Sequence, residues 1–194
     1  MGTIFSTLID YMEAEQWRYE ILEGQTVLRF HVKTKSGRLM CYAEVQEDKY
    51  WLLFYSYLPV NVPEDRMTRV AEFLTRANQG MRIGNFELDF ADGEVRYKTS
   101  IDMEGGEITH KMIDNLLQAN LSTMDRYFNG MMEVVYGSKL PVELIAGIES
   151  PDNDEDDDDE DDDEFAIDDE LDDDDDDIPM DLNEEDDEEE DFRS

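Results

Sequence analysis

Cysteine is almost missing from this sequence, since Cys41 is the only one among 194 residues. One cysteine excludes an intramolecular disulfide and any redox or metal motif built on paired cysteines, which fits a reducing compartment. Apolar runs are short as well, and none approaches the roughly 18 residues of a membrane-spanning helix. The start of the chain lacks the basic flank and apolar core of a secretory signal. We therefore expect a cytoplasmic protein that does not engage a membrane.

Catalytic and cofactor signatures are also missing. The chain contains no GxSxG, HExxH, GxxxxGK or GxGxxG pattern. His31 and His110 are the only histidines and do not have the spacing of metal ligands. Cys41 lies among alternating apolar residues, so we interpret it as a small core residue and not as a nucleophile. We predict no catalytic residue, no cofactor and no metal site, and we expect that the protein is not an enzyme.

Positive charge is scarce, and negative charge is concentrated at one end. Residues 151–194 contain 30 Asp and Glu but one Arg, whereas residues 1–150 contain 23 Asp and Glu and 15 Lys and Arg. Acidic runs repel themselves and bury too little apolar surface to fold. The sequence thus predicts a folded domain over 1–150 and a disordered acidic tail over 151–194. Direct nucleic-acid binding is disfavoured, because phosphate contacts need Lys and Arg.

Apolar periodicity within residues 1–150 predicts an α+β domain. Residues 3–16 have helical spacing, and alternation of period two between residues 19 and 57 indicates a three-stranded antiparallel meander. A second helix follows Pro63 and ends near Gly80, and a β-hairpin occupies 84–102. Thr109 is a suitable N-cap for a long helix that ends near Gly137, and a short helix covers 140–148.

Turn positions predict the register of the meander strands. A two-residue turn at 36–37 would place Val32 opposite Cys41. A second turn at 47–48 would add Tyr50 to the same apolar face, together with the next two alternate residues of its strand. This face would pack against the helices.

The segment GNFELDFADGEVRYKTSID contains three closely spaced acids that could suggest a carboxylate site. Its Asp-Gly pair at 92–93 is typical of a type I′ hairpin, which sets the register. The predicted pairs are Phe90 with Val95, Leu88 with Tyr97, Asp89 with Arg96, and Glu87 with Lys98. Apolar residues meet apolar residues and acids meet bases, so we interpret the acids as structural.

The opposite face of the meander is amphipathic. Its candidate partner surface consists of Met40, Tyr42, Trp51, Leu53 and Tyr55. Arg29, His31 and Lys33 lie on the same face. Met and Tyr are suited to adaptable protein contacts, and a contiguous apolar group is less usual on a free surface than scattered residues. Two alternatives are open: a second layer of helices covers this face, or a protein partner or a second copy does.

Three segments carry a resemblance to a known family. YSYLPVNVPEDR, NQGMRIGNFELDFADGEVRYKTSID and STMDRYFNGMMEVVYG resemble the YbjN family, bacterial proteins labelled sensory transduction regulators. The resemblance covers about residues 3–149 and leaves out the tail. It implies the fold of type III secretion chaperones, which are usually dimeric: a helix, three antiparallel strands, a helix, a hairpin and a closing helix. The family label implies no enzyme and supplies no catalytic residues.

Three functions are consistent with these observations. We favour a non-enzymatic protein-binding module with a chaperone-like or regulatory role, acting as a homodimer. The alternative is a polyanionic adaptor whose acidic tail binds or shields a basic protein, and the third is a small-molecule enzyme with its pocket on the sheet. Candidate tail anchors for the adaptor are Phe165, Ile167, Leu171, Ile178, Met180, Leu182 and Phe192. A tail that only keeps the protein soluble would need no such anchors.

Overall fold

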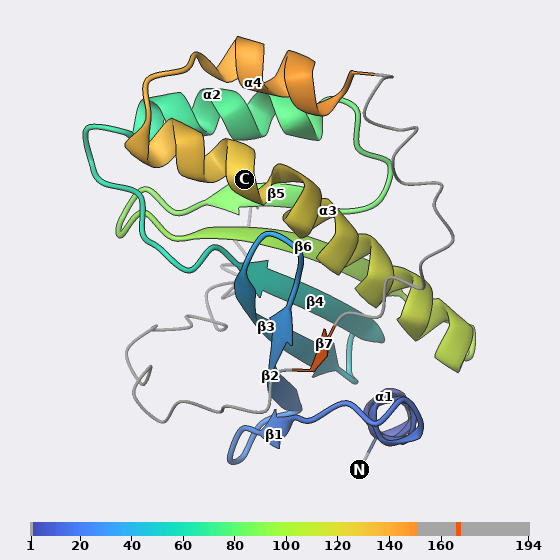
Figure 1. Ribbon diagram of the computed structural model, residues 1–194. Coiled ribbons are helices and arrows are strands. Elements are labelled where there is room, and N and C mark those ends of the chain that lie inside the picture. The colour runs from blue at the N-terminus through green and yellow to red at the C-terminus, as the bar shows by residue number, and fades with distance from the viewer. Residues whose placement is uncertain (1, 151–165, 168–194) are drawn as a thin grey trace, which may run out of the picture.

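The computed structural model describes residues 2–150 and 166–167, and it has an antiparallel sheet with helices on one side (Figure 1). The helices are α1 (Thr3–Ala14), α2 (Met67–Asn78), α3 (His110–Tyr136) and α4 (Pro141–Ile148). The strands are β1 (Glu20–Ile21), β2 (Val27–Lys33), β3 (Arg38–Gln46), β4 (Trp51–Tyr57), β5 (Asn85–Leu88), β6 (Val95–Asp102) and β7 (Ala166–Ile167). Their order is β1-β2-β3-β4-β6-β5, and β7 also pairs with β2. The predicted α+β class and element order are confirmed.

One hydrophobic core lies between the sheet and the helices. Alternate residues of β2, β3, β4 and β6 point toward the helices, and buried residues of all four helices join them in a single cluster. The stripe of α3 supplies many of these contacts. Its ends are those predicted, because the Thr109 side chain accepts a hydrogen bond from the backbone nitrogen of Met112 and the helix ends before Gly137.

The predicted register between β2 and β3 is wrong by two residues. Val32 lies opposite Leu39, and not opposite Cys41. The turn is centred on residues 35–36, one position earlier than predicted. Gly37 lies beyond the turn centre, where it contacts α3. A Cβ atom at Gly37 would lie 2.8 Å from the Phe128 ring, so the glycine allows α3 to approach the end of the hairpin.

The predicted register between β3 and β4 is also wrong by two residues. Gln46 pairs with Trp51, which leaves a four-residue turn at 47–50. Tyr50 adopts a left-handed conformation with φ of 57° and is 51% exposed, so it does not join the core face as predicted. The turn places the carboxylate of Glu47 where it accepts a 2.8 Å hydrogen bond from the backbone nitrogen of Phe5. Glu47 thereby caps α1 with a negative charge, which favours the positive end of the helix dipole.

The hairpin of β5 and β6 shows the same two-residue difference. Glu87 pairs with Arg96 and Leu88 with Val95, so none of the four predicted pairs forms in the ladder. Phe90 is 62% exposed. The carboxylate of Asp89 instead accepts a 2.6 Å hydrogen bond from the backbone nitrogen of Ala91. Glu87 still forms the predicted ion pair with Lys98, although its direct ladder partner is Arg96.

The cause of this difference is Gly93. It is the only turn residue here with a positive φ, 84°, whereas a type I′ turn needs two. Its carbonyl accepts a 2.8 Å hydrogen bond from the backbone nitrogen of Val62, in the segment after β4. The turn is therefore held by a distant segment, and its register follows from that contact and not from the local dipeptide.

Candidate protein-binding face

The side of the sheet turned away from the helices carries the candidate site, which we call the second face. Its centre is a cluster of Val27, Tyr42, Tyr55 and Tyr57, with Leu22, Met40 and Leu53 packed at the margin. Among residues 2–150, no helix contributes a side chain to this cluster. The described helices lie in the core cluster on the other side of the sheet (Figure 1). In the described part of the chain, the alternative of a second helix layer is therefore wrong.

All five residues of the predicted partner surface lie on the second face. Tyr42 and Tyr55 are directly opposite each other on β3 and β4 and are buried, whereas Met40, Trp51 and Leu53 are half-buried. The rings of Tyr42 and Tyr57 meet edge to face with centroids 5.5 Å apart. Such aromatic pairs contribute about 0.5–1.5 kcal/mol beyond their buried area, so the centre of the face is held in a defined arrangement.

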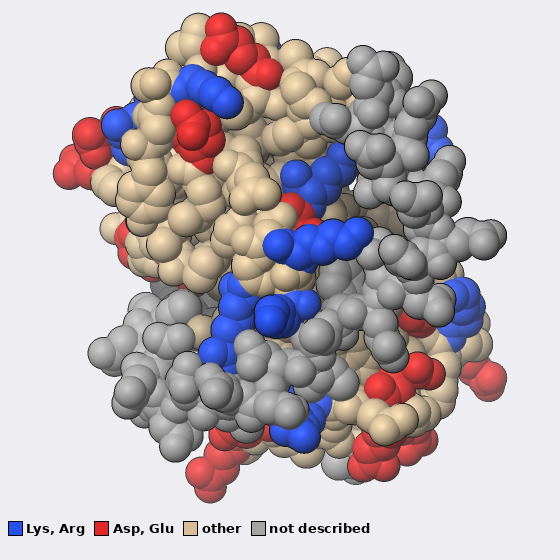
Figure 2. All heavy atoms as spheres, viewed as in Figure 1, with Lys and Arg blue, Asp and Glu red and all other residues tan. Residues whose placement is uncertain are grey.

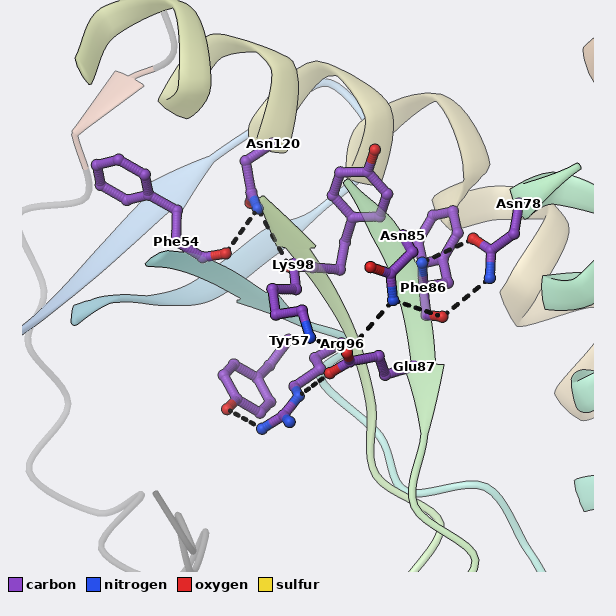
Figure 3. A network of polar contacts seen from close by, with 10 residues as sticks. Phe54, Tyr57, Asn78, Asn85, Phe86, Glu87, Arg96, Lys98 and Asn120 are labelled. Atoms are coloured by element: carbon purple, nitrogen blue, oxygen red, sulfur yellow. Dashed lines mark hydrogen bonds and ion pairs between the residues drawn. The ribbon is translucent and has the colours of Figure 1, made fainter. Parts of the chain in front are cut away.

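Basic residues of β6 complete the face, and sequence reasoning did not place them there. The Arg96 guanidinium carbon lies 4.8 Å from the centroid of the Tyr55 ring, and its Nη1 donates a 3.4 Å hydrogen bond to the Tyr57 hydroxyl. Figure 3 shows Arg96 between Tyr57 and Glu87. The contact depends on the pairing of β4 with β6, and these strands are separated by α2 and β5 in the chain. The sequence alone does not show that they are neighbours.

Glu87 holds the two cations of β6 in place. Its carboxylate accepts a 2.7 Å hydrogen bond from Arg96 Nε and forms an ion pair with Lys98. Burial alone would raise the pKa of Glu87, but the hydrogen bonds from Lys98 and Arg96 bring that pKa below its ordinary value. The acid therefore stays charged and holds both basic side chains in position.

A broad hollow of about 1210 Å³ opens beside the tyrosine cluster. Trp51, Leu53 and Tyr55 line it, together with Arg96 and Lys98 and with the loops at 24–26 and 46–49. Met40 and Tyr42 lie outside it. Because Glu44, Glu47, Asp48 and Asp102 also line it, the hollow combines aromatic and aliphatic surface with charges of both signs.

The remaining titratable groups offer little for catalysis. Cys41 is 1% exposed in the core, as predicted, and burial raises the pKa of its thiol to about 12. A thiol of this kind is protonated at neutral pH and is a poor nucleophile. His31 lies on β2 and His110 begins α3. Residues 2–150 and 166–167 contain no group of three His, Cys, Asp or Glu side chains arranged to bind a metal ion. Over the same residues, no helix is long and apolar enough to span a bilayer.

Glu94, just before β6, gives the protein a pH dependence that can be measured. Burial raises its pKa to about 7; Arg96 opposes the rise, and Asp92 and Asp89 add to it. Because the folded-state pKa lies above the ordinary 4.5, Glu94 costs stability as the pH rises through this window. We expect Glu94→Gln to raise the melting temperature over wild type more at pH 8 than at pH 5.

Thermal melts at the two pH values test this expectation. Glu104→Gln is the control, because it makes the same change at an exposed position. An equal gain at pH 5 and pH 8 for Glu94→Gln would show that ionisation of Glu94 does not oppose folding.

Comparison with known proteins gives three findings. The YbjN family model, described as "Putative bacterial sensory transduction regulator", matches residues 5–133. The crystal structure of YbjN from E. coli is similar with a TM-score of 0.50 and 13% sequence identity, covering 68% of this chain and 87% of that chain. At this identity the likeness shows a shared fold. A search of curated proteins found no match.

Two further solved structures are similar at lower scores. The HopA1-SchA chaperone-effector complex matches with a TM-score of 0.44 and 13% identity, covering 66% of this chain and 95% of that chain. The ExsC-ExsE complex matches with a TM-score of 0.48 and 14% identity, covering 66% of this chain and 96% of that chain.

Proposed function

The chain belongs to the YbjN family, and from this premise we propose that it is a non-enzymatic protein-binding module with a chaperone-like or regulatory role. The second face of the sheet is the observation that supports this function. Its side chains are of the types enriched at protein interfaces, namely Tyr, Trp, Met and Arg. In the described residues it has aromatic packing but no covering helix.

The hollow favours a protein segment over a small molecule. Ligand pockets usually enclose about 300–1,000 Å³ and bury most of their ligand, whereas this hollow is larger, at about 1210 Å³, and is open to solvent. Leu53 and Trp51 are half-buried, so they can lose further exposed area when a partner binds. For the third alternative, an enzyme with its pocket on this face, the described residues supply no metal-binding cluster, and Cys41 is buried in the core.

We expect Leu53→Arg to weaken partner binding, because it replaces half-buried apolar surface beside the tyrosine cluster with a charged side chain. Affinity capture with the full chain identifies partners, and titration of the purified partner then measures their affinity. Wild type and Leu140→Arg should bind equally, since Leu140 is 54% exposed at the start of α4, on the other side of the sheet. Leu53→Arg should bind at least tenfold more weakly, with an unchanged circular dichroism spectrum. Equal binding by both variants would contradict the proposal.

We also propose that the module is a homodimer. The molar masses of Leu53→Arg and Leu140→Arg show whether the second face forms the dimer contact. Light scattering should give twice the chain mass for wild type at about 100 μM. α2 uses its apolar side against α3, α4 and β5, so the second face is the surface that we propose for the dimer contact. A wild-type mass of one chain would contradict dimerisation.

The domain boundary near residue 150 and the role of the acidic tail are further parts of the proposal. Of the candidate tail anchors, Ile167 lies in β7, and the other six lie outside the described residues. A variant that ends at residue 150 should keep the partner, because every residue of the second face precedes that point. If this variant loses the partner while Leu53→Arg keeps it, the polyanionic adaptor is the function.

A further inference from the structure

The outer edge of β2 is shared between two short strands from distant parts of the chain. β1 pairs with Arg29 and Leu28 at the first half of β2, through Glu20 and Ile21. β7 pairs with the second half, where Ala166 lies opposite Lys33 and Ile167 opposite Val32. Figure 1 shows β7 beside the end of β2, antiparallel to it.

This edge has the hydrogen-bonding capacity to accept an extended segment. An edge strand presents unpaired backbone groups that pair readily with another strand, and proteins usually cover or interrupt such edges. β1 begins at Glu20, opposite Arg29, so on this outer edge the part of β2 beyond Arg29 has no strand partner from residues 2–150. The strand that fills this part comes from within the acidic tail.

Charge favours an acidic segment at this position. The β2–β3 hairpin ends in three cations, Lys33, Lys35 and Arg38, and Lys33 is paired with Arg38 across the ladder. Lys and Arg side chains gather over the middle of the molecule in Figure 2, including the β2–β3 end of the sheet. The sequence beside β7 is acidic on both sides, with four acids at 161–164 and three at 168–170. An extended apolar run between acids therefore fits this edge, because its backbone can pair with β2 and its acids lie near the cations of the hairpin end.

We propose that the outer edge of β2 is a strand-docking site, which the chain's own segment at 166–167 occupies intramolecularly. An extended peptide with a short apolar run between acidic residues competes for the same edge. The tail then acts as an internal competitor that restricts which segments the edge accepts. This site is separate from the second face and does not depend on the function proposed for it.

Tethering explains how a two-residue strand can occupy the edge. Docking within one chain proceeds at an effective concentration of about a millimolar for a short connection, so a segment that is weak as a free peptide can still be bound. A free peptide must displace the tethered segment, and its apparent affinity falls by the ratio of that concentration to the segment's own dissociation constant. Weakening the tethered segment should therefore strengthen binding of the free one.

The test uses the full chain and a fluorescein-labelled peptide of residues 160–172, followed by fluorescence anisotropy. The double variant Ala166→Pro, Ile167→Pro removes two backbone donors and restricts both residues without changing charge. Its control is Leu182→Pro, Asn183→Pro, which makes the same change later in the tail. We expect the first variant to bind the peptide at least tenfold more tightly than wild type and the control to equal wild type. Equal affinity for all three proteins would overturn the proposal.

Two further measurements separate strand pairing from charge and from exchange between copies. A peptide with prolines in place of Ala166 and Ile167 should bind the first variant at least tenfold more weakly than the unchanged peptide, and equal binding would reduce the site to charge attraction alone. Amide hydrogen exchange over residues 31–34 should be faster in the first variant than in wild type. Wild-type protection should be the same at 1 and 100 μM, and protection that falls on dilution would overturn intramolecular docking.

Discussion

Replacing Asn120 with alanine should lower the free energy of unfolding by about 3 kcal/mol, because a buried polar residue joins α3 to two strands. Asn120 is 1% exposed. Its Nδ2 donates hydrogen bonds to the backbone oxygens of Phe54 and Tyr97, each 3.1 Å long (Figure 3). Its Oδ1 accepts a hydrogen bond from the Ser56 hydroxyl. Truncation would leave the Ser56 hydroxyl without this acceptor, buried between strand and helix.

Urea unfolding followed by circular dichroism measures the effect. Ser122→Ala is a matched control, since Ser122 lies on the exposed side of the same helix and its hydroxyl bonds only to the backbone oxygen of Gln118 at 2.7 Å in the described structure. We expect the control to change stability by less than about 0.5 kcal/mol. If Asn120→Ala unfolds at the same urea concentration as wild type, the network does not stabilise the fold.

Replacing Gly93 with alanine should lower the free energy of unfolding by at least about 3 kcal/mol, because a conformational penalty and a steric penalty add at this position. The residue has a φ of 84°, which alone costs an L-residue about 1–2 kcal/mol. A Cβ atom would also run into the backbone oxygen of Val62, which belongs to a segment held by its own hydrogen bond to Gly93. Neither the turn nor the Val62 segment can move without breaking that bond.

Gly24 separates the two penalties. Its φ of 75° is similar, but an added Cβ would have no neighbour within 4 Å. We expect Gly24→Ala to cost about 1 kcal/mol, the conformational part alone. Equal losses for the two variants would show that the contact with Val62 does not hold the turn.

The faces of the strands were predictable from sequence, and the partners of individual residues were not. Alternation of apolar residues assigns each side chain to a face, and a register shift of two residues keeps that assignment unchanged. All three predicted registers differ from the observed ones by this amount. The information that selects among such registers is tertiary: Phe128 against Gly37, and Val62 against Gly93.

The candidate site was partly predictable for the same reason. Met40, Tyr42, Trp51, Leu53 and Tyr55 lie together on the second face, because alternation places them there. Tyr57 also follows this alternation and could have been included. Arg96 could not, because no local pattern shows that β6 lies next to β4. Asn120 did carry a signal, as an amide in the middle of an otherwise apolar helical stripe.

The turn at 47–50 connects two places that the sequence separates. Glu47 lines the hollow of the second face, and its carboxylate also bonds to the Phe5 nitrogen at the first turn of α1. An occupant that draws this carboxylate into the hollow would uncap the helix, and fraying of α1 would in turn release the acid toward the hollow. Since such linkage is reciprocal, the two events share one free energy of coupling. Exchange of the Phe5 amide would therefore report, from the core side of the sheet, whether the opposite side is occupied.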